Sequence, residues 1–134
     1  MGPGGPGLGG PGMATGRAWE NPAMSGSMPE PAPVDLLEVL KALGNPARLQ
    51  IMEWLRDPKT SFAEYEAIAD PEEVGVCVTH LAAKSGLAQS TVSTYMSMLE
   101  RTGMVSSVRV GKWTHYRRQD SRVEEVLSEL GRHI

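Results

Sequence analysis

The stretch LAAKSGLAQSTVSTYMSMLERTG, residues 81–103, decides the fold of this chain. It places Ala82, then Gly86 four residues later and Val92 six residues after that. In a helix-turn-helix the small residue lets two helices approach, glycine accepts the left-handed turn, and a β-branched side chain packs between the helices. The spacing therefore predicts a helix beginning at Val78, a tight turn over 85–87 and a second helix over 89–102.

The second predicted helix has an apolar face and a polar face. Val92, Met96 and Leu99 recur at helical spacing and are expected to face inward. The other face carries short hydrogen-bonding side chains, which suit contacts with base edges in a major groove. The candidate DNA-contacting residues of this helix are Gln89, Ser90, Thr91, Ser93, Thr94 and Tyr95.

Residues 104–118 predict a β-hairpin. Two β-rich runs, MVSSVRV and WTHYRR, flank Gly111–Lys112, which suits a two-residue turn. A helix-turn-helix followed at once by a basic hairpin is a winged helix, whose wing contacts the DNA backbone or the adjacent minor groove. An ordinary solvated hairpin face is the plainer alternative, and Trp113 and Tyr116 are expected to pack rather than to stack on bases. The candidate wing contacts are Arg109, Lys112, Arg117 and Arg118.

The charge is distributed in favour of this interpretation. The net charge is −3, but residues 78–118 hold six Lys or Arg against one Asp or Glu, whereas residues 1–77 hold five against eleven. A basic segment inside an acidic chain presents a local positive surface, and that surface matters more to a polyanion than the total charge does.

Helices are expected on both sides of this motif. Leucines at helical spacing predict a first helix that ends at Gly44, and Asn45 with Pro46 suits the start of a second, whose apolar face would include Leu49, Ile51, Met52 and Leu55. A short helix is expected around 62–68. Ser121 with Glu124 predicts a capping box for the last helix. The expected fold class is mainly α with a small β-hairpin (α+β), a winged helix-turn-helix of about five helices plus a two-stranded wing.

The chain is expected to form one domain, over residues 33–134, behind a Gly/Pro-rich tail at 1–32 that should be disordered. Met13, Met24 and Met28 are alternative starts. A single cysteine precludes an internal disulfide, and no apolar run approaches the length of a bilayer span, so a cytoplasmic protein is expected. No cofactor is expected.

Three blocks, ALGNPARLQIM, LAAKSGLAQSTVSTYMSMLERTGMV and VRVGKWTHYR, together resemble the ArsR/SmtB family of bacterial winged-helix transcriptional repressors. The resemblance covers residues 34–130. It implies a homodimer that pairs through its first and last helices, binds an imperfect palindrome and usually represses transcription. The residues that it assigns to dimerisation are Leu36, Leu37, Leu40, Val123, Val126, Leu127 and Leu130.

The chain departs from the family pattern at several positions. Ala88 replaces a common serine at the start of the recognition helix, so capping must come from elsewhere, such as Ser90, or be lost. Thr94–Tyr95 replaces a common His–His pair, so base preference cannot be copied from relatives.

Cys77 and His80 raise a separate hypothesis of metal sensing. Cys77 matches the first position of a family Cys-x-Cys site, but Thr79 stands at the second; the other family site has Arg122 where a histidine is usual. Soft-metal sites normally use three or four N or S ligands, so no metal site is predicted.

The sequence alone is compatible with three hypotheses about the function. The favoured one is a DNA-binding regulator with no enzymatic activity, because Cys77 and His80 come with no recognisable catalytic pocket. The alternatives are a metal- or thiol-responsive sensor that uses Cys77, and a winged-helix protein-interaction module. The effector is not predicted, although residues 58–75 are where an effector pocket is expected.

Overall fold

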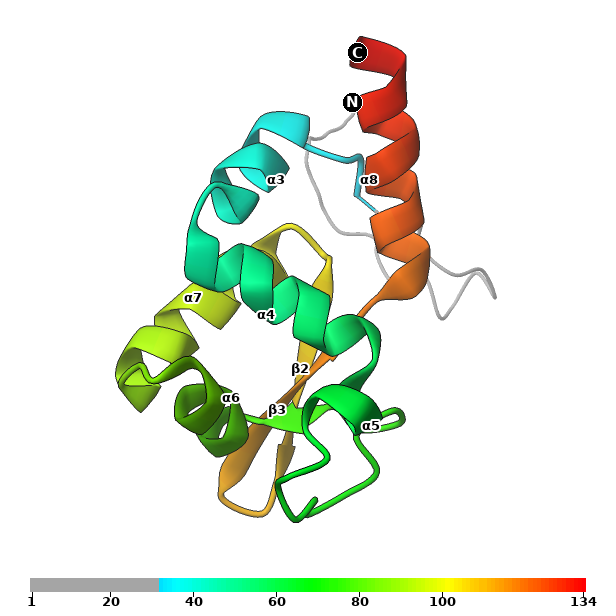
Figure 1. The fold of residues 1–134 in the computed structure, drawn as a ribbon. Helices are drawn as coiled ribbons and strands as arrows, with labels where there is room; N and C mark the ends of the chain where they lie inside the picture. Colours follow the sequence, from blue (N-terminus) through cyan, green and yellow to red (C-terminus); the bar gives the residue numbers. More distant parts are fainter. Residues whose placement is uncertain (1–31) are drawn as a thin grey trace, which may run out of the picture. The chain divides into compact units, whose positions relative to one another are not determined.

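Residues 32–134 are described by the computed structural model of the chain, drawn in Figure 1. The expected tail over 1–32, with its alternative starts, falls almost entirely outside this range. The chain divides into units over 1–33 and 34–134, and the second carries every element described below. Between residues 32 and 134, no helix is both long enough and apolar enough to cross a bilayer.

The described residues form six helices and a three-stranded antiparallel sheet, so the predicted winged helix-turn-helix is confirmed, with one more helix and one more strand than expected. In chain order the elements are α3 (Leu36–Leu43), α4 (Pro46–Arg56), α5 (Pro58–Ser61), β1 (Val76–Cys77), α6 (Val78–Ser85), α7 (Gln89–Arg101), β2 (Val105–Val110), β3 (Trp113–Arg118) and α8 (Asp120–His133).

Helix α4 begins as predicted but turns a different face inward. The side chain of Asn45 accepts hydrogen bonds from the backbone N–H groups of Ala47 and Arg48, at 2.9 and 3.1 Å, and Pro46 is the first helical residue. The expectation that Leu49 belongs to the apolar face is wrong, because Leu49 is 55% exposed. Arg48 takes the inward position, at the helical spacing set by Met52 and Leu55.

The expectation of a short helix around 62–68 is also wrong. The short helix of this region lies earlier, at Pro58–Ser61, because Pro58 suits a first helical position and Phe62 already leaves the helix. The ring of Phe62 is buried and meets Trp54 edge-on, with 5.9 Å between centroids. This contact anchors the segment that follows, which runs without regular structure to β1.

The sheet has the order β1-β3-β2, so β1 extends the predicted two-stranded wing. Val110 pairs with Trp113 around the two-residue turn, and Cys77 pairs with His115 on the other edge of β3. Gly75 precedes β1 with φ of 109°, and a Cβ there would lie 2.4 Å from the carbonyl oxygen of Tyr116. Only glycine fits that approach without displacing the backbone.

Helix α8 begins at Asp120, so the predicted capping box is wrong. Ser121 is already inside the helix, and Gln119 occupies the cap position without a side-chain cap. The backbone N–H of Gln119 donates to the carbonyl oxygen of Met104, and its side chain donates to the hydroxyl of Ser106. These contacts with the start of the hairpin set the first residue of α8, which a local sequence pattern could not reveal.

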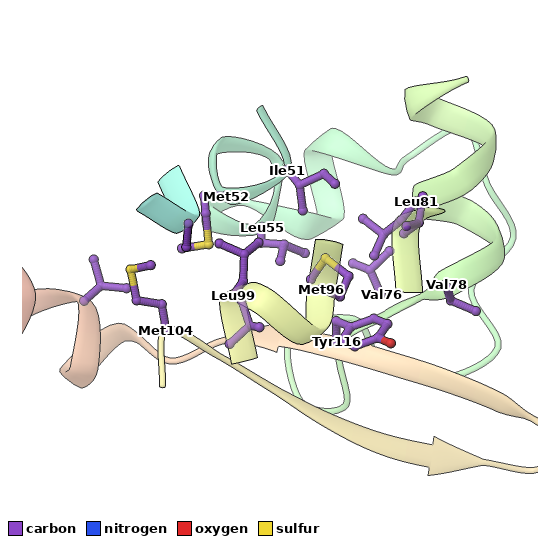
Figure 2. Close-up of a cluster of buried hydrophobic side chains, with 14 of the residues drawn as sticks. Ile51, Met52, Leu55, Val76, Val78, Leu81, Met96, Leu99, Met104 and Tyr116 are labelled. Carbon is purple, nitrogen blue, oxygen red and sulfur yellow. The ribbon is translucent and has the colours of Figure 1, made fainter. Parts of the chain in front are cut away.

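One apolar core joins these elements. In Figure 2 the side chains of Ile51 and Leu55 from α4 meet those of Met96 and Leu99 from α7, with Tyr116 of β3 beneath them. Helices α3 and α8 lie side by side in Figure 1 and pack against each other. Two predicted dimerisation residues, Val123 and Val126, are buried in the core of the chain itself.

Candidate nucleic-acid interface

The turn between α6 and α7 has the geometry that its sequence predicts. Gly86 has φ of 73°, and its backbone N–H donates to the carbonyl oxygen of Ala82 at 2.9 Å. Val92 is fully buried, and Ala82 and Leu87 pack against the core beside it. The helix-turn-helix is therefore confirmed in both backbone and packing, with α7 as its second helix.

The N-terminus of α7 has no side-chain cap. Ala88 occupies the cap position, and neither Ser90 nor another side chain accepts a hydrogen bond from the first turn. The sequence left two possibilities, a cap from Ser90 or the loss of the cap, and the structure shows the loss. The first backbone N–H groups of a helix have no partner within it, and with the helix dipole they favour an anionic oxygen from outside.

The predicted contact residues of α7 are not equally exposed. Gln89, Ser90 and Thr94 are exposed, and the hydroxyl of Thr94 donates to the carbonyl oxygen of Ser90 at 3.1 Å. Thr91 is half-buried.

Ser93 lies on the inner side of α7. It is half-buried, near the phenol of Tyr116. Burial raises the pKa of the Tyr116 phenol, the nearby Glu100 carboxylate raises it further, and the Ser93 hydroxyl lowers it. Ser93 is thus less exposed than Gln89, Ser90 and Thr94.

Tyr95 is joined to a buried arginine that the sequence did not single out. The guanidinium of Arg48 lies over the Tyr95 ring, 4.8 Å from its centroid, and Arg48 is only 8% exposed. The Nε of Arg48 donates to the carbonyl oxygen of Ala42 at 2.6 Å, close to the C-terminus of α3. Arg48 therefore links α3 to the recognition helix.

The four basic residues of the wing do not form one patch. Arg109 and Lys112 are exposed beside the turn, where the ammonium of Lys112 lies 5.4 Å from the centroid of the Trp113 ring. Arg109 pairs with Thr114, so Arg117, three residues further, lies on the opposite face of the hairpin. Arg118 binds the carboxylate of Asp120 at 2.6 Å. Arg109 and Lys112 are therefore the exposed wing cations beside the turn, and Arg117 is exposed on the other face.

Cys77 and His80 do not form a metal centre with other residues of the described chain, where no group of three or more His, Cys, Asp or Glu side chains is placed to hold an ion. Cys77 is buried and its sulfur lies 3.1 Å from the hydroxyl of Thr79. The His80 ring stacks on Tyr65, with centroids 5.1 Å apart. Burial lowers the pKa of His80, and His115 adds a smaller effect in the same direction.

Several known proteins are similar to this chain in sequence or in fold. The family model described as Penicillinase repressor matches residues 66–132. The HTH-type transcriptional regulator YbzH of Bacillus subtilis is 40% identical over 94 residues, covering 70% of this chain and 93% of YbzH. ArsR2 of Halobacterium salinarum, named as a repressor of an arsenical resistance operon, is 33% identical over 93 residues, covering 69% of this chain and 65% of ArsR2.

A crystal structure of an ArsR family transcriptional regulator has the same fold, with a TM-score of 0.52 and 17% identity, over 73% of this chain and 84% of the other. The sequence matches all belong to regulators of transcription and not to enzymes. The matches fall on the winged helix-turn-helix, and they show that the chain belongs to the Penicillinase repressor family, among the helix-turn-helix regulators of transcription.

Proposed function

We propose that the chain is a homodimeric repressor that binds an imperfect palindrome, with α7 in the major groove and the hairpin on the backbone or in the minor groove. The observation that carries the proposal is the pairing of an exposed polar start of α7 with exposed cations beside the hairpin turn. Two such subunits would place recognition helices about 34–36 Å apart, in successive major grooves.

Within α7, base contact is assigned to the exposed residues first. Gln89, Ser90 and Thr94 lie on the open face of the helix, and Thr91 beside them. Tyr95 already lies against Arg48 and Ser93 is half-buried, so we assign them a supporting part in fixing the helix. The uncapped N-terminus of α7 suits a backbone phosphate at the edge of the groove.

The division between wing and helix is tested by two substitutions and a control. Arg109→Ala should weaken binding to every DNA sequence and reduce the slope of log affinity against log salt by up to about one unit, because one phosphate contact is lost. Gln89→Ala should instead reduce discrimination between operator and random DNA, by about 1–3 kcal/mol. Lys41→Ala, an exposed cation on α3, serves as the control and should change neither.

Gel shifts with the chain's own promoter fragment and with random DNA, each at two salt concentrations, measure both quantities. Equal effects of Arg109→Ala and Gln89→Ala on specific and random DNA would contradict the assignment. Weak, salt-insensitive binding by the unmodified chain would favour the protein-interaction module instead.

The dimer is proposed to form through exposed leucines of α3 and α8. Leu37 is 70% exposed, Leu40 45% and Leu127 59%, on two helices that pack against each other. Leu36 and Leu130 are half-buried beside them, and the buried Val123 and Val126 support the helix from within. Exposed leucines gathered on adjacent helices favour contact with an apolar partner surface.

Leu127→Asp should convert the dimer to a monomer, because a carboxylate would then be buried against an apolar surface. Leu49→Asp is the matched control, since Leu49 is similarly exposed but lies on α4. Sedimentation velocity of both variants measures the change in mass. A Leu127→Asp protein that remains dimeric would refute this interface.

A further inference from the structure

A pocket of about 220 Å³ lies beneath the irregular segment after α5. Its lining comes from α5, that segment, β1, the start of α6, and β3. The first helix of the helix-turn-helix and the wing therefore meet at one cavity. The lining includes Phe62, Tyr65, Ile68, Val76, Cys77 and His115.

Ring and charge contacts hold the segment over the pocket. Tyr65 stacks on His80 with an angle of 19° between the rings, and the carboxylate of Glu64 pairs with Lys84 of α6 at 3.2 Å. Lys59 also lines the pocket, and its ammonium is paired with Glu72 at 3.5 Å. The cavity is thus formed before any ligand arrives, as most small-molecule sites are.

His115 lines this pocket and has an unused hydrogen-bonding atom. It is 1% exposed, and its Nδ1 lies 3.4 Å from the carbonyl oxygen of Trp113. A carbonyl can only accept, so in the neutral ring Nδ1 carries the hydrogen and Nε2 is left as an acceptor. Within the described chain Nε2 has no hydrogen-bond partner. A buried acceptor without a donor is unfavourable, and a ligand that supplies the donor removes that cost.

We propose that this pocket binds a small, uncharged, largely apolar molecule of about one aromatic ring, which donates one hydrogen bond to Nε2 of His115. A cavity of about 150 Å³ holds benzene in another protein, so this volume suits a ring with a small substituent. The apolar lining disfavours an ionised ligand. Small side-chain adjustments, which are common on binding, would bring the donor to Nε2.

A bound molecule would contact α6 of the helix-turn-helix and β3 of the wing together. Any effect of that molecule on DNA binding rests on the proposed function. Binding itself does not require DNA.

The hydrogen bond is tested with phenol and toluene, which have nearly the same shape but differ in one donor. NMR titrations of the full chain should show saturable shifts at pocket residues, with phenol bound about threefold to tenfold more tightly than toluene, as one hydrogen bond implies. In His115→Phe, which keeps a ring of similar size, this preference should vanish. A variant that still prefers phenol to the same degree would overturn the assignment.

The location is tested by filling the pocket. Ala69 lines the cavity and is half-buried, so Ala69→Leu should weaken both probes at least tenfold. Ala83→Leu, on the exposed side of α6 and outside the lining, should bind both normally. Equal binding by the two variants would overturn the proposal, as would saturable binding of zinc with no binding of phenol. A chain that binds phenol but not DNA would refute the proposed function alone.

Discussion

Replacing Arg48 with methionine tests how a buried cation stabilises the domain. Met has nearly the same helix propensity and can fill the space of the aliphatic stem, so Arg48→Met removes chiefly the guanidinium. What is lost is the 2.6 Å hydrogen bond to the carbonyl oxygen of Ala42, a longer one to that of Lys41 at 3.4 Å, and the contact with the Tyr95 ring.

The expected cost follows chiefly from the short hydrogen bond and the ring contact. A hydrogen bond from a charged group contributes about 1.5–3 kcal/mol, and a largely desolvated cation over an aromatic ring about 1 kcal/mol. Together they predict that the free energy of unfolding falls by about 2–4 kcal/mol. Arg56→Met, the same change at an exposed position of the same helix, should alter it by less than about 0.5 kcal/mol.

Urea unfolding followed by circular dichroism measures both variants. The protein concentration must be equal, because the stability of a dimer depends on it. A double-mutant cycle with Tyr95→Leu then isolates the ring contact. A loss from Arg48→Met within about 1 kcal/mol of that from Arg56→Met would refute the reasoning.

Two further predictions concern a glycine and a histidine. Gly75→Ala should lower the free energy of unfolding by more than about 2 kcal/mol, because the new Cβ would meet the backbone of Tyr116. Gly131→Ala, in open space within α8, should instead raise it by about 0.5–1 kcal/mol. Thermal unfolding of both variants measures the difference. Burial and His115 lower the pKa of His80 below its ordinary value of 6.5, so the unfolded chain binds a proton at His80 more readily than the folded chain does. The contribution of His80 to stability should therefore be fully present above pH 6.5 and should be lost as the pH drops below it. Urea midpoints across this pH range should show a shallower fall in His80→Phe, and an equal fall in both proteins would remove His80 from the explanation.

The elements that the sequence predicted are those whose causes are local. Gly86 and Val92 specify the turn between α6 and α7 through their own conformations and size. The hairpin likewise follows from a two-residue turn between β-rich runs. Strand β1 escaped prediction because it is two residues long and exists only through pairing with β3.

Arg48 shows where spacing should have outweighed residue type. Position 48 lies three, four and seven residues before Ile51, Met52 and Leu55, so helical periodicity alone turns it inward. Leu49 was assigned to the core because it is apolar, and it is exposed.

The pocket was anticipated only in part. Its covering segment could be located from sequence, but its other walls are brought together by β1–β3 pairing, which places Cys77 opposite His115. The unequal exposure of the α7 residues likewise depends on contacts with distant elements.

Strand β1 also governs how the domain can meet DNA. It runs directly into α6, and through its pairing with β3 it joins the helix-turn-helix to the wing by backbone hydrogen bonds. A second link joins the two parts, because the hydroxyl of Ser107 in β2 donates to the carboxylate of Glu100 in α7 at 2.7 Å. In the proposed complex, the groove contact and the backbone contact of one subunit would thus be held at a fixed separation. Differences between half-sites would then be absorbed by bending of the DNA or by movement of one subunit against the other, and not by a swinging wing.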